Sequence, residues 1–236
     1  MKTTLIALTV ALWSIVTNAF ASASPIAPFS ADYVVSRNGT DIGKSTISLS
    51  ENSDTTWTLV TNTRGTSGLA RMIGLDITEK SAIRWRDGQP ETVTYDYRQN
   101  GAFKKRTRHA ELDWTRSTAS VSEGDEHYDF AVGPGTVDRH AASLVLATAL
   151  ARGNPQSIDV KVMVKDRVED NQYTARDHQP LDVPAGKFDT TALETTKDRR
   201  TSTSWFAKSI GWVPVQIQQT NKSGDVIVLK LVKINR

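Results

Sequence analysis

The sequence predicts a mainly β fold in which an antiparallel sheet wraps around one buried helix. Two observations lead to this prediction. Most of the 236 residues fall into short runs of alternating apolar and polar side chains separated by turn residues, the pattern of strands and hairpins. One segment, 136–152, breaks this period and shows a helical, almost wholly apolar pattern instead.

The strands are justified by alternation and by turn signals. Residues 29–36 and 42–50 flank Asn38-Gly39, a strong two-residue hairpin signal. The run 225–235 is apolar on both faces, which predicts a central or doubly covered strand. We expect strands at 29–36, 42–50, 57–63, 81–86, 92–98, 102–109, 158–164, 173–176, 190–196, 201–206, 212–220 and 225–235.

The helix is predicted at about 138–152 by start and stop signals in the right order. Asp138 is a suitable N-cap, Arg152 falls in the last turn, and Gly153 follows the last helical residue. Between Ala141 and Ala151 only two side chains are polar, and a helix that is apolar nearly all round is typically buried. We therefore expect one central buried helix, with the sheet wrapped around it.

The N-terminus has the order of features found in secretory signal peptides. Lys2 precedes an uncharged apolar run, and two overlapping A-x-A cleavage signals end at Ala21 and Ala23. The run is shorter than the roughly 18–20 residues that a membrane span needs, which disfavours an uncleaved anchor. We expect a signal peptide at 1–23, cleaved after Ala21 or Ala23. A single β-rich domain at 24–236 would then be periplasmic or secreted.

Composition excludes several classes of function. The chain has no cysteine, so thiol chemistry, cysteine-bound metals and lipid attachment to a cysteine are excluded. The 29 basic and 26 acidic residues nearly balance. The sequence does not show the concentrated basic face that would predict nucleic-acid binding. The four histidines show no metal-ligand spacing, and 65–69 fails the nucleophile-elbow pattern at its last position. We expect no catalytic residue, no metal and no cofactor.

Two charged clusters each allow two interpretations. Glu123, Asp125, Glu126 and Asp129 indicate a charged hairpin turn, although paired carboxylates could also process a glycan. The basic run 104–109 is typical of a solvated strand face, and it could alternatively hold an anionic group.

The segment 66–75 is the candidate ligand-binding element. It carries Leu69, Met72, Ile73 and Leu75, with glycines at Gly68 and Gly74. One interpretation is a simple crossover packed on the sheet edge, and the other is an apolar lid over a ligand cleft.

The order of several short motifs resembles the bacterial family of domains of unknown function numbered 3108. The matching positions cover nearly the whole chain after residue 28: Phe29, Ala31, Tyr33, Gly39, Gly43, 66–70, Glu79, Ser81, 90–97, Asp138, 183–188, 205–206 and 213–215. The resemblance implies an exported protein whose antiparallel sheet is rolled into a half-barrel, similar in shape to periplasmic lipoprotein carriers. It implies no activity, so no catalytic residue is carried over.

Together these features predict a non-catalytic binding or chaperone-like envelope protein. Its partner would be an apolar or amphiphilic ligand, such as a lipid, or another envelope protein. The protein would lie near a membrane without spanning it. Two alternatives stay open: an enzyme that processes an envelope polysaccharide with paired carboxylates, and a purely structural envelope protein.

Overall fold

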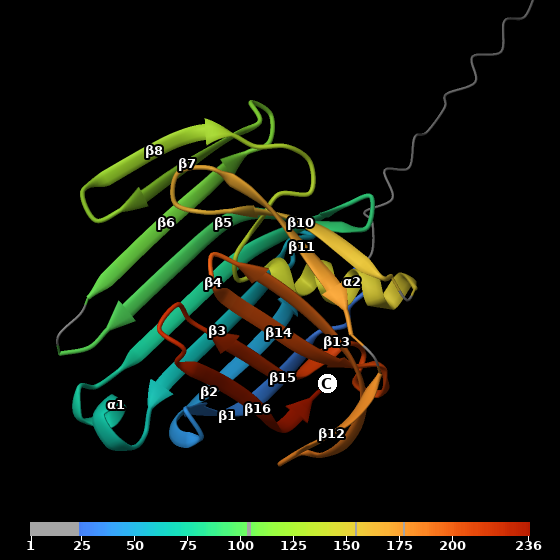
Figure 1. The fold of residues 1–236 in the computed structure, drawn as a ribbon. Helices are drawn as coiled ribbons and strands as arrows, with labels where there is room; N and C mark the ends of the chain where they lie inside the picture. Colours follow the sequence, from blue (N-terminus) through green and yellow to red (C-terminus); the bar gives the residue numbers. More distant parts are fainter. Residues whose placement is uncertain (1–23, 103–104, 154, 177) are drawn as a thin grey trace, which may run out of the picture.

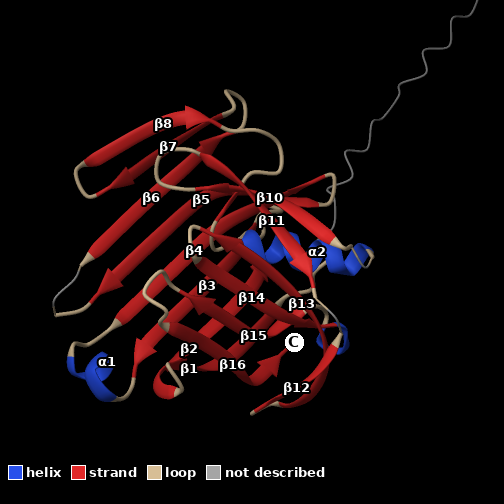
Figure 2. Ribbon diagram, viewed as in Figure 1, coloured by secondary structure: helices blue, strands red, loops and turns tan. Residues whose placement is uncertain are grey.

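The computed structural model describes residues 24–102, 105–153, 155–176 and 178–236, and the predicted signal peptide at 1–23 lies outside them. Strands dominate the described part (Figure 1, Figure 2). The elements are β1 Phe29–Arg37, β2 Thr40–Glu51, β3 Trp57–Gly65, α1 Gly68–Met72, β4 Asp76–Arg86, β5 Gln89–Asn100, β6 Arg106–Asp113, β7 Thr118–Glu123, β8 Glu126–Ala131, β9 Val137–Asp138, α2 Ala142–Arg152, β10 Ser157–Met163, β11 Val168–Ala175, β12 Gln179–Val183, β13 Gly186–Lys197, β14 Arg200–Ala207, the 3-10 turn η1 Lys208–Ile210, β15 Val213–Thr220 and β16 Val226–Asn235.

The strands form one large open sheet in the order β8-β7-β6-β5-β4-β3-β2-β1-β16-β15-β14-β13-β11-β10-β9, with β12 paired to β13 off this path. The described pairs are antiparallel except β9 with β10. Because β16 lies beside β1, the last strand joins the two halves of the chain into one sheet, which is strongly curved (Figure 1).

The alternation of buried and more exposed side chains shows which face of each strand points to the interior. In β1 the buried residues are Phe29, Ala31, Tyr33 and Val35, with half-buried residues between them. The Tyr33 hydroxyl donates to the carbonyl of Pro214 at 2.8 Å, which joins β1 to β15 across the interior. Burial raises the pKa of this phenol, so it stays protonated as a donor.

Two distant parts of the sheet are bonded where β9 meets β5. Thr92 of β5 donates from its amide to the carbonyl of Thr136 at 3.2 Å and from its hydroxyl to Oδ2 of Asp138 at 2.8 Å. The Asp138 amide donates back to the Thr92 hydroxyl oxygen at 2.8 Å. We call this pair the Thr92–Asp138 latch. It holds the curvature of the sheet, because β5 and β9 are far apart in strand order.

The helix differs from the prediction in position and in burial. Helix α2 begins at Ala142, because Asp138 lies in β9 and its carboxylate accepts from the amides of His140 and Ala141 at the preceding turn. The side of α2 that packs on the sheet is buried, but Ala151 and Arg152 are exposed and other positions are half exposed. The expected fully buried, central helix is therefore wrong. The sheet is open and does not close around α2, and the alanines that face outward do not need to be buried.

Two hydrophobic clusters support the sheet. The larger lies between α2 and the concave face of the sheet and includes Tyr33, Leu59, Leu150 and Phe206. The smaller surrounds Tyr95 where β5, β6 and β7 meet the end of β10. No helix among the described residues has the length and hydropathy needed to cross a bilayer.

Several strand predictions need correction. The charged hairpin turn predicted in 123–129 is confirmed at Gly124-Asp125, but the two strands that it joins, β7 and β8, were not predicted, and they extend the sheet edge. Strand β16 is central in strand order, but only Leu231 is buried and Val232 is 45% exposed, so double covering is wrong. Its outward face combines half-buried Val226 and Val228 with exposed Lys230.

Candidate ligand-binding site

The concave face of the sheet and one side of α2 enclose a hollow of about 370 Å³. This volume falls within the range of small-molecule sites, about 300–1,000 Å³. Strands β1 to β4, β11 and β14 to β16 contribute side chains to it. Its apolar wall consists of Val35, Ile47, Ile77, Ala142, Leu146, Ile217, Ile227 and Leu229.

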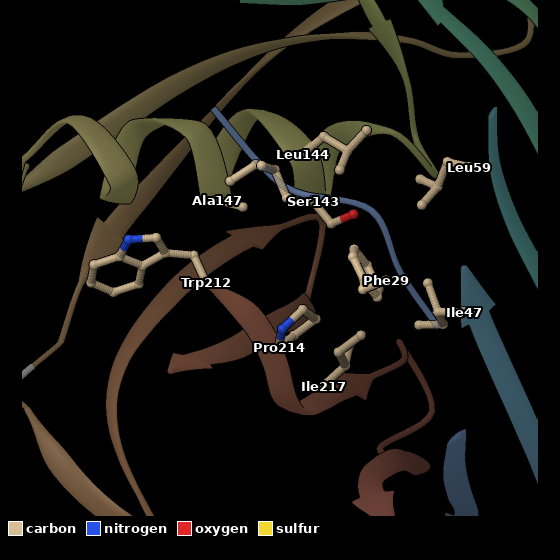
Figure 3. Close-up of a pocket in the computed structure, with 10 residues that line it drawn as sticks. Phe29, Ile47, Leu59, Ser143, Leu144, Ala147, Trp212, Pro214 and Ile217 are labelled. Atoms are coloured by element: carbon tan, nitrogen blue, oxygen red, sulfur yellow. The ribbon is translucent and has the colours of Figure 1, made fainter. Parts of the chain in front are cut away.

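A smaller apolar cavity of about 30 Å³, close to the space of one water molecule, lies deeper against α2. It shares Ile47, Ser143 and Ile217 with the larger hollow, so the two are adjacent. Figure 3 shows Ser143 on the side of α2 that faces Phe29, with Trp212 at one side of the cavity. The hollow thus approaches the hydrophobic core beneath the helix.

The polar side of the hollow is an ion pair supported by two tyrosines. Arg139 Nη2 lies 3.2 Å from Glu79 Oε2, and the Tyr95 hydroxyl donates to the same carboxylate oxygen at 2.7 Å. Arg139 Nε also donates to the Tyr95 oxygen at 3.1 Å, and its guanidinium lies 5.0 Å from the centre of the Tyr97 ring. Burial alone would raise the pKa of Glu79, but Arg139 and these hydrogen bonds hold it below its usual value. Both partners are therefore charged at neutral pH.

His140 lies next to this ion pair and is fully satisfied. Its Nε2 is 2.8 Å from the Thr61 hydroxyl, and its Nδ1 is 2.9 Å from the Ser81 hydroxyl. Burial lowers the pKa of His140, so the ring is neutral at neutral pH. A neutral ring has one donor and one acceptor, and a hydroxyl can serve either nitrogen. The histidine therefore orders the wall without adding charge.

The lining as a whole carries no net charge. Glu79 and Arg139 neutralise each other, and the remaining polar lining groups are uncharged: Thr61, Thr63, His140, Ser143, Tyr173, Ser202, Ser204 and Gln219. An apolar wall facing uncharged hydrogen-bonding groups suits a molecule with an apolar chain and a neutral or zwitterionic polar end.

The four residues predicted as ligand-binding lie outside this hollow. Leu69 and Met72 of α1 are 67% and 82% exposed, and Ile73 and Leu75 are half buried. None of the four lines either cavity. They do lie beyond the end of the hollow, because its lining residues Thr63 and Ile77 pair near the ends of β3 and β4 from which α1 projects.

Sequence reasoning missed the ion pair, although a signal was present. Ile77, Glu79, Ser81 and Ile83 alternate along β4, so the Glu79 carboxylate shares a face with two apolar side chains. A charged residue on an apolar strand face needs a partner. Its partner Arg139 is 60 residues further along the chain, and no local pattern connects the two.

The acidic hairpin is held by cations. Glu123 accepts from Arg106 and Arg108, and Glu126 pairs with Lys165. Burial opposes the shift at Glu123, but its arginine partners lower its pKa, and bonds from Lys165 and Tyr128 lower that of Glu126. A general acid of a glycosidase needs a raised pKa. These two carboxylates are poorly suited to that role.

Three residues of the basic run 104–109, and Ser67 of the segment 65–69 that partly matches a nucleophile elbow, have structural partners as well, whereas Lys104 lies outside the described residues. Arg106 and Arg108 bind Glu123, while His109 contacts Asp96 at 2.7 Å on the other face. The Ser67 hydroxyl donates to the backbone carbonyl of Asp41. Within the described ranges, no group of three or more His, Cys, Asp or Glu residues is placed to hold a metal ion.

The class of the protein follows from this geometry: a curved, open and mainly antiparallel sheet with a hollow on its concave face. The fold is similar to that of a β-barrel-like protein of the domain of unknown function DUF1849 from Brucella abortus. The two are 11% identical with a TM-score of 0.55, over 90% of this chain and 99% of that one, which shows a shared fold alone.

The family is shown by sequence. The chain matches the model described as "Protein of unknown function (DUF3108)" over residues 32–232, and it belongs to this family, which confirms the predicted resemblance. No curated protein matches the chain. A protein with a YmcC-like fold from Bacteroides fragilis aligns over 92% of this chain and 98% of its own at 12% identity. Its TM-score of 0.28 is too low to indicate a shared fold.

Proposed function

We propose that this protein binds an amphiphilic molecule in the hollow beside α2, as a carrier or chaperone-like protein without catalysis. The observation that carries the proposal is the two-sided lining. A continuous apolar wall from β1, β2, β15 and β16 faces the neutralised Glu79–Arg139 pair. An apolar chain would pack on the wall, and each methylene removed from water would contribute about 0.8 kcal/mol.

The charge of the lining defines the class of ligand. Glu79 would repel an anionic head group, and Arg139 would repel a cationic one. Neither charge is free to bind an ionic head group, because the two residues already pair with each other. A zwitterionic or uncharged head would instead exchange hydrogen bonds with hydroxyls such as those of Ser202 and Ser204 without breaking the pair. The proposed ligand therefore has one apolar chain and a neutral or zwitterionic head.

The proposed site of action is outside the cytoplasm. Residues 1–23 have the features of a signal peptide, so the remaining β-rich chain would act outside the cytoplasm, where amphiphiles must cross an aqueous space between membranes. The curved sheet would serve as the half-barrel in which the ligand is held.

The test fills the hollow without disturbing the fold. Ser143 lines both cavities and lies on a helix, so Ser143→Leu adds apolar volume at the site and also improves helix propensity. Ala151 lies on the same helix but is exposed, so Ala151→Leu is the matched control. Binding of N-phenyl-1-naphthylamine would be followed by fluorescence, with displacement by lyso-phosphatidylcholine.

We expect the wild type and Ala151→Leu to bind the probe alike and Ser143→Leu to bind about tenfold or more weakly, a change of 1.4 kcal/mol. Lyso-phosphatidylcholine should displace the probe better than dodecanoate does. Equal affinity for all three proteins, or no displacement by either amphiphile, would contradict the proposal.

A further inference from the structure

Helix α1 presents an unusual apolar tip to solvent. Among the described residues, the exposed large hydrophobic side chains are Leu69 at 67%, Met72 at 82% and Val232 at 45%. Leu69 and Met72 are three positions apart on one helix, so their side chains lie on the same side of it. None of the residues of α1 is buried. Exposed large apolar groups gathered on a projecting element typically mark an interaction site.

The same end of the sheet is strongly basic. The segments around α1 are 40–45, 62–78, 98–102 and 105–108, because α1 packs on β2 and β3 and the Ala102 amide donates to the carbonyl of Ile73 at 2.8 Å. These segments contain seven Lys and Arg residues and two acidic ones. The basic residues are Lys44, Arg64, Arg71, Arg98, Lys105, Arg106 and Arg108, and the acidic ones are Asp41 and Asp76.

Several of these cations are available to an external partner. Arg64 pairs with Asp76, and two arginines pair with Glu123. Within the part of the chain that the structure describes, Lys44, Arg71, Arg98 and Lys105 are exposed and form no ion pair. Asp41 is the one acidic residue of these segments that forms no ion pair among the described residues, so the unpaired charge around the apolar tip is positive on balance.

The lining of the hollow extends toward this end of the sheet. Thr63 and Ile77 line the hollow and pair with each other, and the next pair along β3 and β4 is Arg64 with Asp76. The Gly65 amide then bonds to the carbonyl of Leu75 at 2.8 Å and closes the base of the α1 segment. A molecule leaving the hollow along these strands would emerge beside α1.

We propose that the α1 tip and the cations around it are a docking surface for an anionic phospholipid bilayer. Leu69 and Met72 enter the interfacial region, while Arg71, Lys105 and their neighbours contact the anionic head groups. Amphipathic segments with this division bind bilayers through apolar burial together with electrostatic attraction. The mouth of the hollow then faces the membrane. This surface goes beyond amphiphile binding and can fail separately from it.

The absence of cysteine makes the test direct. A single Met72→Cys substitution can be labelled with the environment-sensitive dye NBD, and Val232→Cys is the matched exposed apolar control on β16. Each labelled protein is mixed with vesicles of phosphatidylcholine alone or with 30% phosphatidylglycerol, about the anionic content that gives a strongly negative surface.

We expect a blue shift and increased emission at position 72 with the anionic vesicles only, and no change at position 232. In unlabelled protein, Arg71→Ser should weaken vesicle co-sedimentation about fivefold, the loss expected for one surface cation. Leu69→Ser with Met72→Ser should weaken it about tenfold or more. High salt should weaken binding of the wild type, because these cations are exposed.

Three results would overturn the docking surface: no shift at position 72, an equal shift at position 232, or a concentration-dependent dimer that buries α1 in light scattering. Ser143→Leu separates the two proposals, since it should still dock on anionic vesicles although its hollow is filled. Because the substituted tip residues are exposed, these variants should melt like the wild type, and an unchanged Tm keeps the comparison valid.

Discussion

The Thr92–Asp138 latch predicts a large stability loss from one buried carboxylate. Asp138 is fully buried, and its carboxylate accepts from the amides of His140 at 2.8 Å and Ala141 at 3.0 Å and from the hydroxyl of Thr92 at 2.8 Å. Asp138→Ala leaves three buried donors without an acceptor. Each charge-assisted bond is worth about 1.5–3 kcal/mol, and partial relaxation reduces the sum to about 4 kcal/mol.

Asp138→Asn separates the capping role from the latch. The amide oxygen can still accept from the two backbone amides, but the amide nitrogen faces Thr92, whose hydroxyl proton then has no acceptor. We expect a loss of about 1–2 kcal/mol for this variant. Asp129→Ala is the control, because Asp129 is exposed and its contact with His127 at 3.3 Å lies on the surface. Its loss should be under about 0.5 kcal/mol.

Urea unfolding followed by tryptophan fluorescence measures these differences. For a chain of this size about 4 kcal/mol corresponds to a fall in Tm of about 8–16 °C. The order of stability should be wild type and Asp129→Ala, then Asp138→Asn, then Asp138→Ala. If Asp138→Ala unfolds within 1 kcal/mol of Asp129→Ala, the latch does not hold the curved sheet and the reasoning fails.

Two further predictions concern His140 and the base of α1. Burial holds the pKa of His140 below its unfolded value, so the unfolded chain takes up the proton first, and stability is lost as pH falls from about 7 to 5. His140→Gln should flatten that slope in urea titrations, and an unchanged slope would show that His140 is not its source. A Cβ on Gly65 would lie 2.4 Å from the carbonyl oxygen of Ala70, so Gly65→Ala must displace α1. Trypsin should then cut faster after Arg71 than in Gly153→Ala, where no atom lies within 4 Å of the added Cβ; equal rates would show that α1 tolerates the change.

The alternation of the sequence was enough to predict most strands. Val160 and Val162 are buried in β10 with exposed Lys161 between them, as the period of two indicates. The hairpin at Asn38-Gly39 forms because both residues have positive φ, 49° and 82°. Such signals are local, so they can be interpreted without knowledge of the rest of the fold.

Other features depended on contacts that no local pattern contains. Asp138 has the character of an N-cap, but its hydrogen bonds with Thr92 hold it in β9. Helix α2 therefore begins later, at Ala142. The charged turn within 123–129 was predicted, but strand β7 before it was not, although buried Ala119 and Val121 give that strand an inward face.

For the candidate site too, local features could be predicted from the sequence and contacts between distant residues could not. The apolar segment 66–75 was identified from composition, and the structure places it at the end of the hollow and not in its wall. The wall itself is assembled from strands at both ends of the chain, such as β1 and β16. Glu79 and Arg139, which form the polar side of the hollow, are 60 residues apart in the sequence. Only the fold brings these two residues together.

Quenching of tryptophan fluorescence by a brominated acyl chain tests the central claim most directly. Trp212 lines the small cavity beneath α2 that adjoins the hollow and shares Ser143 with it, whereas Trp114 packs in the second cluster with its indole donating to the carbonyl of Thr92. Bromine quenches only at contact, so lyso-phosphatidylcholine brominated near the end of its chain should quench the wild type and Trp114→Phe when that end reaches from the hollow to the adjoining cavity. Most of that quenching should be lost in Trp212→Phe. Equal quenching in all three proteins, or none in the wild type, would contradict binding in the hollow with the acyl chain directed toward α2.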